Sequence, residues 1–128
     1  MHAIILNEPF RAVFYAPFYV AEARIAERQA EFAAMIRGMA AALRFVNTTP
    51  PAEIAATVAP MFPEVPQPAL AAALARYQSL GLWSATPHFP RAAFDQLQGA
   101  MRSAGVIKGA PAFEACVDED IVARALGR

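Results

Sequence analysis

The sequence predicts a predominantly helical α+β protein, and three observations support this prediction. The chain has 128 residues, enough for a single domain, 1–128. It is 57% hydrophobic with a mean hydropathy of +0.31, so it can bury a core. Much of this apolar content is alanine, with runs at 40–42 and 71–73, and alanine has the highest intrinsic helix propensity.

Two short strands are expected at the N-terminal end. Residues 3–6 (AIIL) have the pattern of a short buried strand, and residues 13–20 (VFYAPFYV) are aromatic and β-branched. Pro17 limits the second strand to a sheet edge or interrupts it. A two-stranded sheet is marginal alone, so these strands are expected to join a larger sheet or dock on helices.

The clearest predicted element is a helix that begins near Ala21 and ends at residues 47–50. Its apolar side chains recur with the spacing of one helix face, at Phe32, Met35, Ile36, Met39, Leu43 and Val46. A short helix is expected to follow. Thr49 is its predicted N-cap, Pro50 lies in its first turn, and Glu53 completes a capping box.

Proline and glycine divide the remainder of the chain. Four prolines between 60 and 68 predict a connector, because proline cannot continue a helix interior. A helix follows over about 68–80, with Gly81 just past its end. Another helix opens at Pro90 and ends at Gly105, and a last one spans Asp120 to Leu126. Trp83 is expected to be largely buried between the helices on either side of it.

Charge and hydropathy exclude several functions. The net charge is zero with a pI near 6.7, and no basic cluster suggests a nucleic-acid surface. No stretch offers the roughly 18 apolar residues of a membrane span. The N-terminal segment MHAIILNEPFRAVFY lacks the features of a secretory signal, which predicts a cytoplasmic protein if Met1 is the correct start.

The residues that usually carry chemistry do not form a catalytic pattern. His2 and His88 lack metal-ligand spacing, and His88 is expected on the surface. The single cysteine, Cys116, stands among acids that oppose thiolate formation, so a buried, inert thiol is expected. The acidic residues 118–120 fit a helix N-terminus better than a cation site. No serine lies in GxSxG and no glycine-rich phosphate loop exists. We therefore expect no catalytic residue, cofactor or metal, and no enzyme.

Three segments carry a family resemblance: ALARYQSLGLWS, FPRAAFDQLQGAMRSAGVIKG and FEACVDEDIVARAL. In this order, residues 18–120 resemble the C-terminal region of the solute-binding proteins of bacterial ABC importers, of the type that takes nitrate, sulfonates such as taurine, or thiamine-pyrimidine precursors. The resemblance implies a partial type II periplasmic-binding-protein-like lobe, truncated at its front. It also implies a periplasmic protein without catalytic activity, which presents a small solute to an ABC permease.

The segment MHAIILNEPF resembles the part of this family that delivers an acidic or aromatic residue to the ligand cleft. The resemblance implies a ligand site at Asn7, Glu8 and Phe10, with Tyr15 and Tyr19 behind them. Glu8 would accept hydrogen bonds from the ligand and the aromatic rings would stack on it. Aromatic side chains in such a strand are more often core than ligand contacts, so both roles stay open for the tyrosines.

Two other functions remain open. The first is a helical interaction protein that has lost solute binding and acts by self-association or by binding another chain. The near-zero net charge and the apolar surface expected in a partial lobe favour a homo-oligomer, most simply a dimer. The second, an enzyme that makes a thiamine precursor, rests on a related eukaryotic branch whose cysteine-rich motif this sequence lacks.

Overall fold

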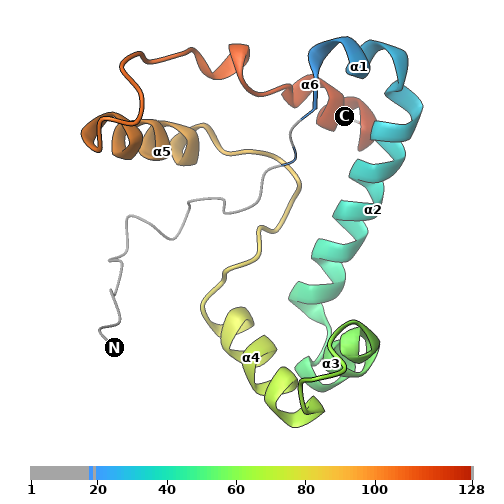
Figure 1. The fold of residues 1–128 in the computed structure, drawn as a ribbon. Coiled ribbons are helices and arrows are strands. Elements are labelled where there is room, and N and C mark those ends of the chain that lie inside the picture. Colours follow the sequence, from blue (N-terminus) through green and yellow to red (C-terminus); the bar gives the residue numbers. More distant parts are fainter. Residues whose placement is uncertain (1–17, 19, 128) are drawn as a thin grey trace. The chain divides into compact units, whose positions relative to one another are not determined.

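A computed structural model describes Phe18 and residues 20–127 of the chain. The regular elements of this part are all helical (Figure 1), and in chain order they are α1 (Glu22–Glu27), α2 (Gln29–Thr48), α3 (Pro51–Val58), η2 (Ala59–Met61), α4 (Gln67–Ser79), α5 (Arg91–Ser103), η3 (Phe113–Ala115) and α6 (Glu119–Ala125). The chain divides into two compact units, Met35–Pro87 and a second unit that combines Met1–Ala34 with His88–Arg128. We call them the central unit and the terminal unit.

The predicted α+β fold class is wrong for the described residues, among which no strand occurs. A type II lobe is built on a sheet, and no described segment supplies one. Of the predicted strand 13–20, only Phe18 and Val20 are described; both are exposed and irregular. The predicted strand 3–6 lies outside the described residues. The physical reason is that the described apolar residues recur at helical spacing and are rich in alanine, so they favour helices over strands.

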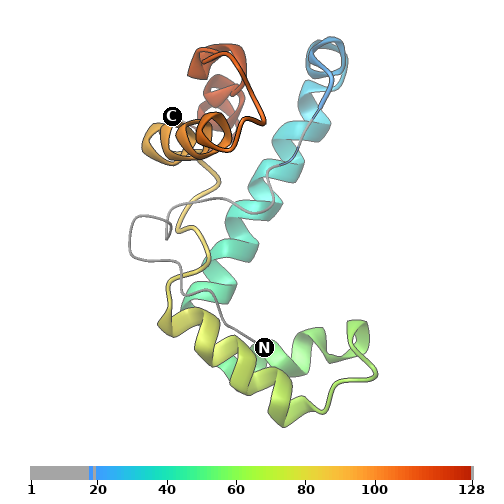
Figure 2. The same ribbon diagram turned by 60° about the vertical axis from the view of Figure 1, so that its left-hand side comes forward.

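The core of the central unit lies between α3 and α4, which lie next to each other in both views (Figures 1 and 2). Ile54 and Ala55 of α3 are almost fully buried against Leu74 of α4. Trp83 packs on this cluster and meets the Tyr77 ring edge-to-face, with centroids 5.8 Å apart. Trp83 is half-buried, so the expectation of a largely buried indole was too strong.

Three helices begin directly after a proline in extended conformation. Pro50, Pro66 and Pro90 have φ between −64° and −56° and ψ between 130° and 138°, and they precede α3, α4 and α5. Proline is restricted to this φ and cannot donate a backbone hydrogen bond, so it suits the position before a helix. The predicted Thr49 cap is therefore wrong, because α3 begins one residue later and has no side-chain cap.

Two side-chain amides, Gln78 of α4 and Asn47 of α2 itself, hold the C-terminal end of α2. The Gln78 amide of α4 donates to the carbonyls of Val46 and Thr49, at 2.8 Å each. The Asn47 amide donates to Leu43 at 2.8 Å and to Ser84 at 3.1 Å. The last carbonyls of a helix have no intrahelical donors, so these bonds tie α2 to α4 and to the segment after it.

Glycine ends α4 and α5 as the sequence predicted. Gly81 and Gly105 have φ values of +60° and +70°, which L-residues with a side chain rarely adopt. After α4, the Leu82 N–H donates back to Tyr77 at 3.2 Å; after α5, the Val106 N–H donates to Met101 at 2.9 Å. Both patterns are Schellman closures, which use the last free carbonyls of each helix. Val106 is therefore part of the closing turn of α5.

The described C-terminal part of the terminal unit contains α5, η3 and α6. Phe113 of η3 is buried, and the Phe94 ring of α5 meets it edge-to-face with centroids 5.4 Å apart. The Arg91 guanidinium lies 4.5 Å from the Phe113 ring centroid, a cation–π arrangement. These aromatic contacts link η3 to the beginning of α5.

Candidate interaction surface

The predicted ligand site lies outside the described residues. This applies to Asn7, Glu8, Phe10, Tyr15 and Tyr19, so their predicted roles stay predictions. The neighbouring Phe18 is described, and 68% of its surface is exposed. It therefore does not contribute to a core.

His88 is half-buried and paired, contrary to the expectation of a surface residue. Its Nδ1 lies 2.5 Å from Glu119 Oε2, while Glu119 Oε1 accepts the Phe89 N–H at 2.6 Å. The carboxylate therefore holds two successive residues before α5. The Nε2 atom of His88 is buried and has no hydrogen-bond partner in the described part of the chain. The Glu119 carboxylate therefore joins residues 88 and 89, which precede α5, to the first turn of α6.

The acidic residues 118–120 lie at a helix N-terminus, as the sequence predicted. Asp118 is the N-cap of α6, and its side chain accepts the Ile121 N–H at 3.0 Å. Glu119 and Asp120 occupy the first turn, where carboxylates interact favourably with the helix dipole. Within Phe18 and 20–127, no group of three or more His, Cys, Asp or Glu side chains has the arrangement of a metal site.

Cys116 is exposed, so the prediction of a buried thiol is wrong. It follows η3 directly and lies at the end of that short helix. Glu114, two residues earlier, forms an ion pair with Arg91. A hydrogen bond with its own backbone, and then the bond from Arg91, hold the pKa of the Glu114 carboxyl below its ordinary value.

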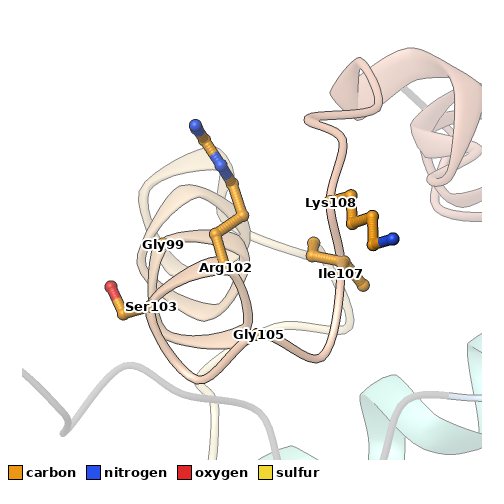
Figure 3. A pocket seen from close by; sticks show the side chains of 6 residues that line it. All are labelled: Gly99, Arg102, Ser103, Gly105, Ile107 and Lys108. Carbon is orange, nitrogen blue, oxygen red and sulfur yellow. The ribbon is translucent and has the colours of Figure 1, made fainter.

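An open hollow lies beside the C-terminal end of α5. Its six lining residues come from α5 and the segment after it: Gly99, Arg102, Ser103, Gly105, Ile107 and Lys108. Its volume of about 680 Å³ would suit a small molecule. However, Figure 3 shows the Arg102, Ser103 and Lys108 side chains pointing in different directions. Convergent polar groups are what give a ligand site its specificity, so we assign no ligand to this hollow.

The central unit combines a low charge density with exposed apolar side chains. Only five of its 53 residues are Asp, Glu, Lys or Arg, against 17 of the other 75. The large apolar residues exposed on it are Met35, Phe45, Met61, Phe62, Val65, Tyr77 and Leu82. Single exposed apolar residues are common on proteins, but grouped ones mark interaction surfaces.

Three of these side chains lie close together in sequence, on the segment that joins α3 to α4. Met61, Phe62 and Val65 have 76%, 47% and 39% of their surfaces exposed. We call residues 59–66 the connector. The sequence located this segment through its prolines but did not predict its exposed apolar character. The available signal was a set of large apolar residues that follow neither helical nor strand periodicity.

A small apolar hollow lies on the same helix pair. It has a volume of about 240 Å³ and is lined by Ala52 of α3 and by Gln67, Pro68 and Ala71 of α4. The small alanine side chains leave this space open between the two helices. The central unit thus has both exposed apolar side chains on the connector and a small apolar hollow between α3 and α4.

Comparisons with known proteins identify no relative of this chain. No family description, no curated protein and no solved structure matches it. The resemblance to solute-binding proteins thus rests on the sequence segments alone. None of the helices in the described ranges has the length and apolar character needed to cross a membrane.

Proposed function

We propose that this chain is a non-enzymatic interaction protein, which binds another polypeptide through the apolar surface of its central unit. The observation that supports the proposal is the exposure of three large apolar side chains, Met61, Phe62 and Val65, within five residues of the connector. Their contact with water is unfavourable, and covering them with a partner releases free energy of about 25 cal/mol per Å² of apolar area. Interface centres are enriched in methionine and aromatic residues and poor in charge, as this surface is.

The binding reaction involves no bond making or breaking. The connector supplies apolar contact area, and it joins two helices, α3 and α4, that pack on each other. Binding residues supported by a rigid scaffold lose little conformational freedom when a partner binds. The chain therefore has the features of a recognition surface.

Solute recognition in ABC import remains a second, sequence-based prediction. It is supported by the order of the LGLW, AGVIK and FEACVDEDIVARAL segments. Its predicted ligand residues and its periplasmic location rest on the same resemblance. A rise in melting temperature with a sulfonate or a thiamine pyrimidine would support it. No shift with any such solute, together with partner binding at the connector, would favour the interaction protein.

The proposed function can be tested by site-specific photo-crosslinking in cells that produce the chain. A photoreactive phenylalanine analogue replaces Phe62, and in a control it replaces Ala73, which is exposed on α4. We expect a discrete protein adduct from position 62 and little from position 73. Mass spectrometry then identifies the second chain in the adduct. Equal, diffuse labelling from both positions would contradict an interaction role for the connector.

A further inference from the structure

Met61 is the most exposed of the methionines that the structure describes. Its exposed fraction is 76%, against 39% for Met35 on α2. Met39 on α2 and Met101 on α5 are half-buried. A dissolved oxidant must reach the thioether sulfur before it can react, so the exposure of the side chain sets the order in which methionines are oxidised. The structure therefore ranks Met61 first among these four.

Oxidation of Met61 is expected to leave the fold intact. The buried cluster between α3 and α4 is built from other residues. Two backbone hydrogen bonds order the connector: the Phe62 N–H donates to the Ala59 carbonyl and the Val65 N–H donates to the Phe62 carbonyl, both at 3.0 Å. An oxygen atom added to the side chain of Met61 removes neither bond. The modification would therefore change the surface of the connector and not its backbone.

The reaction of a methionine with hydrogen peroxide is an oxygen transfer. A lone pair of the sulfur attacks one peroxide oxygen, so that an S–O bond forms and the O–O bond breaks. The proton on the transferred oxygen passes to the departing hydroxide, which leaves as water. Sulfur is oxidised by two electrons and the peroxide is reduced by two. The sulfoxide product is polar, whereas the thioether is apolar, and thiol-dependent sulfoxide reductases reverse the reaction.

We propose that Met61 is a peroxide-sensitive modification site, and that its oxidation to the sulfoxide weakens partner binding at the connector. The effect on binding rests on the proposed function, whereas the preferential oxidation of Met61 rests on its exposure alone. A partner that covers the connector buries the sulfoxide oxygen together with the apolar side chains of Phe62 and Val65. Burying a polar group without a hydrogen bond is unfavourable. Oxidation thus weakens binding without unfolding the chain, and reduction restores it.

Peptide mass mapping measures the order of oxidation in the purified chain. Trypsin cleaves after Arg and Lys, and it places the four described methionines in separate peptides: 29–37, 38–44, 45–76 and 92–102. The chain is treated with limiting hydrogen peroxide, and the fraction of each peptide that carries one added oxygen is followed with time. We expect Met61 to be oxidised about twofold faster than Met35, in line with their exposed fractions of 76% and 39%. Oxidation of Met61 no faster than that of the half-buried Met39 and Met101 would overturn the proposal.

Two substitutions of Met61 test the effect on binding. Met61→Gln introduces a polar side chain of similar length and imitates the sulfoxide, whereas Met61→Leu stays apolar and does not react with peroxide. With the photoreactive analogue at position 62, Met61→Gln is expected to reduce the specific adduct about fivefold or more, because the partner buries an unpaired polar group. Peroxide treatment of the cells should reduce the adduct to a similar extent when Met61 is present and leave that of Met61→Leu unchanged. The leucine variant thus controls for oxidation of the exposed Cys116 and of the partner.

Urea unfolding followed by Trp83 fluorescence separates a loss of binding from a loss of folding. Met61→Gln should have the wild-type urea midpoint, and a lowered midpoint would overturn the proposal, since Trp83 packs on the core of the central unit. An adduct that forms but responds neither to peroxide nor to Met61→Gln would also overturn it, and would leave the interaction function standing. The absence of any specific adduct from position 62 would contradict the proposed function and, with it, the effect of oxidation on binding.

Discussion

Ile54 is the residue on which the stability of the central unit depends most directly. Only 1% of its surface is exposed, and it lies in one cluster with Ala55 and Leu74. Val58, Leu70, Ala71 and Trp83 surround this cluster. Because α3 is short and its other buried residue is an alanine, no neighbouring large side chain on α3 can replace Ile54 in the core.

Replacement of Ile54 by alanine should cost about 2–5 kcal/mol, the usual range for large-to-small changes in a core. A folded unit of 53 residues has a total stability of only about 3–8 kcal/mol, at roughly 0.05–0.15 kcal/mol per residue. We therefore expect Ile54→Ala to leave the central unit partly or fully unfolded at room temperature. Ile54→Val should cost about 0.5–1.5 kcal/mol and leave it folded.

Urea unfolding followed by Trp83 fluorescence measures this effect. Trp83 is the single tryptophan and packs on the Ile54 cluster, so the signal reports on the central unit. Met35→Ala, at an exposed position of α2, is the control and should change the free energy of unfolding by less than about 0.5 kcal/mol. An Ile54→Ala protein with wild-type stability would refute the packing of α3 on α4 described above.

Three further predictions concern a helix end, a glycine pair and an ion pair. Gln78→Ala removes both bonds to the end of α2 and should lower the unfolding free energy by about 1–2 kcal/mol in the same urea assay, whereas an unchanged midpoint would mean that water replaces the amide. Gly81→Ala should destabilise by about 1–2 kcal/mol, because a residue with a side chain is strained at its φ of +60°. No neighbouring atom obstructs a methyl group there, so this backbone strain is the whole expected cost. Gly38→Ala, in the interior of α2, should instead stabilise by about 0.5–1 kcal/mol; effects of the same sign at both glycines would contradict the described helix end. The low pKa of Glu114 means that its ion pair contributes at neutral pH and is lost as acid protonates the carboxylate below its ordinary pKa of 4.5. In Arg91→Ala, a carboxyl NMR titration should show the pKa of Glu114 rising part of the way towards its ordinary value, because the bond of Glu114 with its own backbone remains. An unchanged pKa would show that the ion pair does not form in solution.

The sequence alone determined much of the helical pattern. The helix-terminating roles of Gly81 and Gly105 could be predicted, because a positive φ is a local property that glycine satisfies without neighbours. The acidic start of α6 could be predicted for a similar reason, since Asp118 caps a backbone N–H within its own turn. The connector was also located correctly, because proline excludes a helix interior whatever surrounds it.

The tertiary structure decided which side chains meet across the chain and which remain exposed. The pairing of His88 with Glu119 joins residues 31 positions apart, and no local pattern indicates it. The bonds from Gln78 to the end of α2 are equally non-local. The exposure of Met61 and Phe62 could not be predicted either, because an apolar residue in a connector can turn inward or outward. Hydrophobic periodicity indicates which side chains favour burial, but the packing of other elements decides whether those side chains are buried.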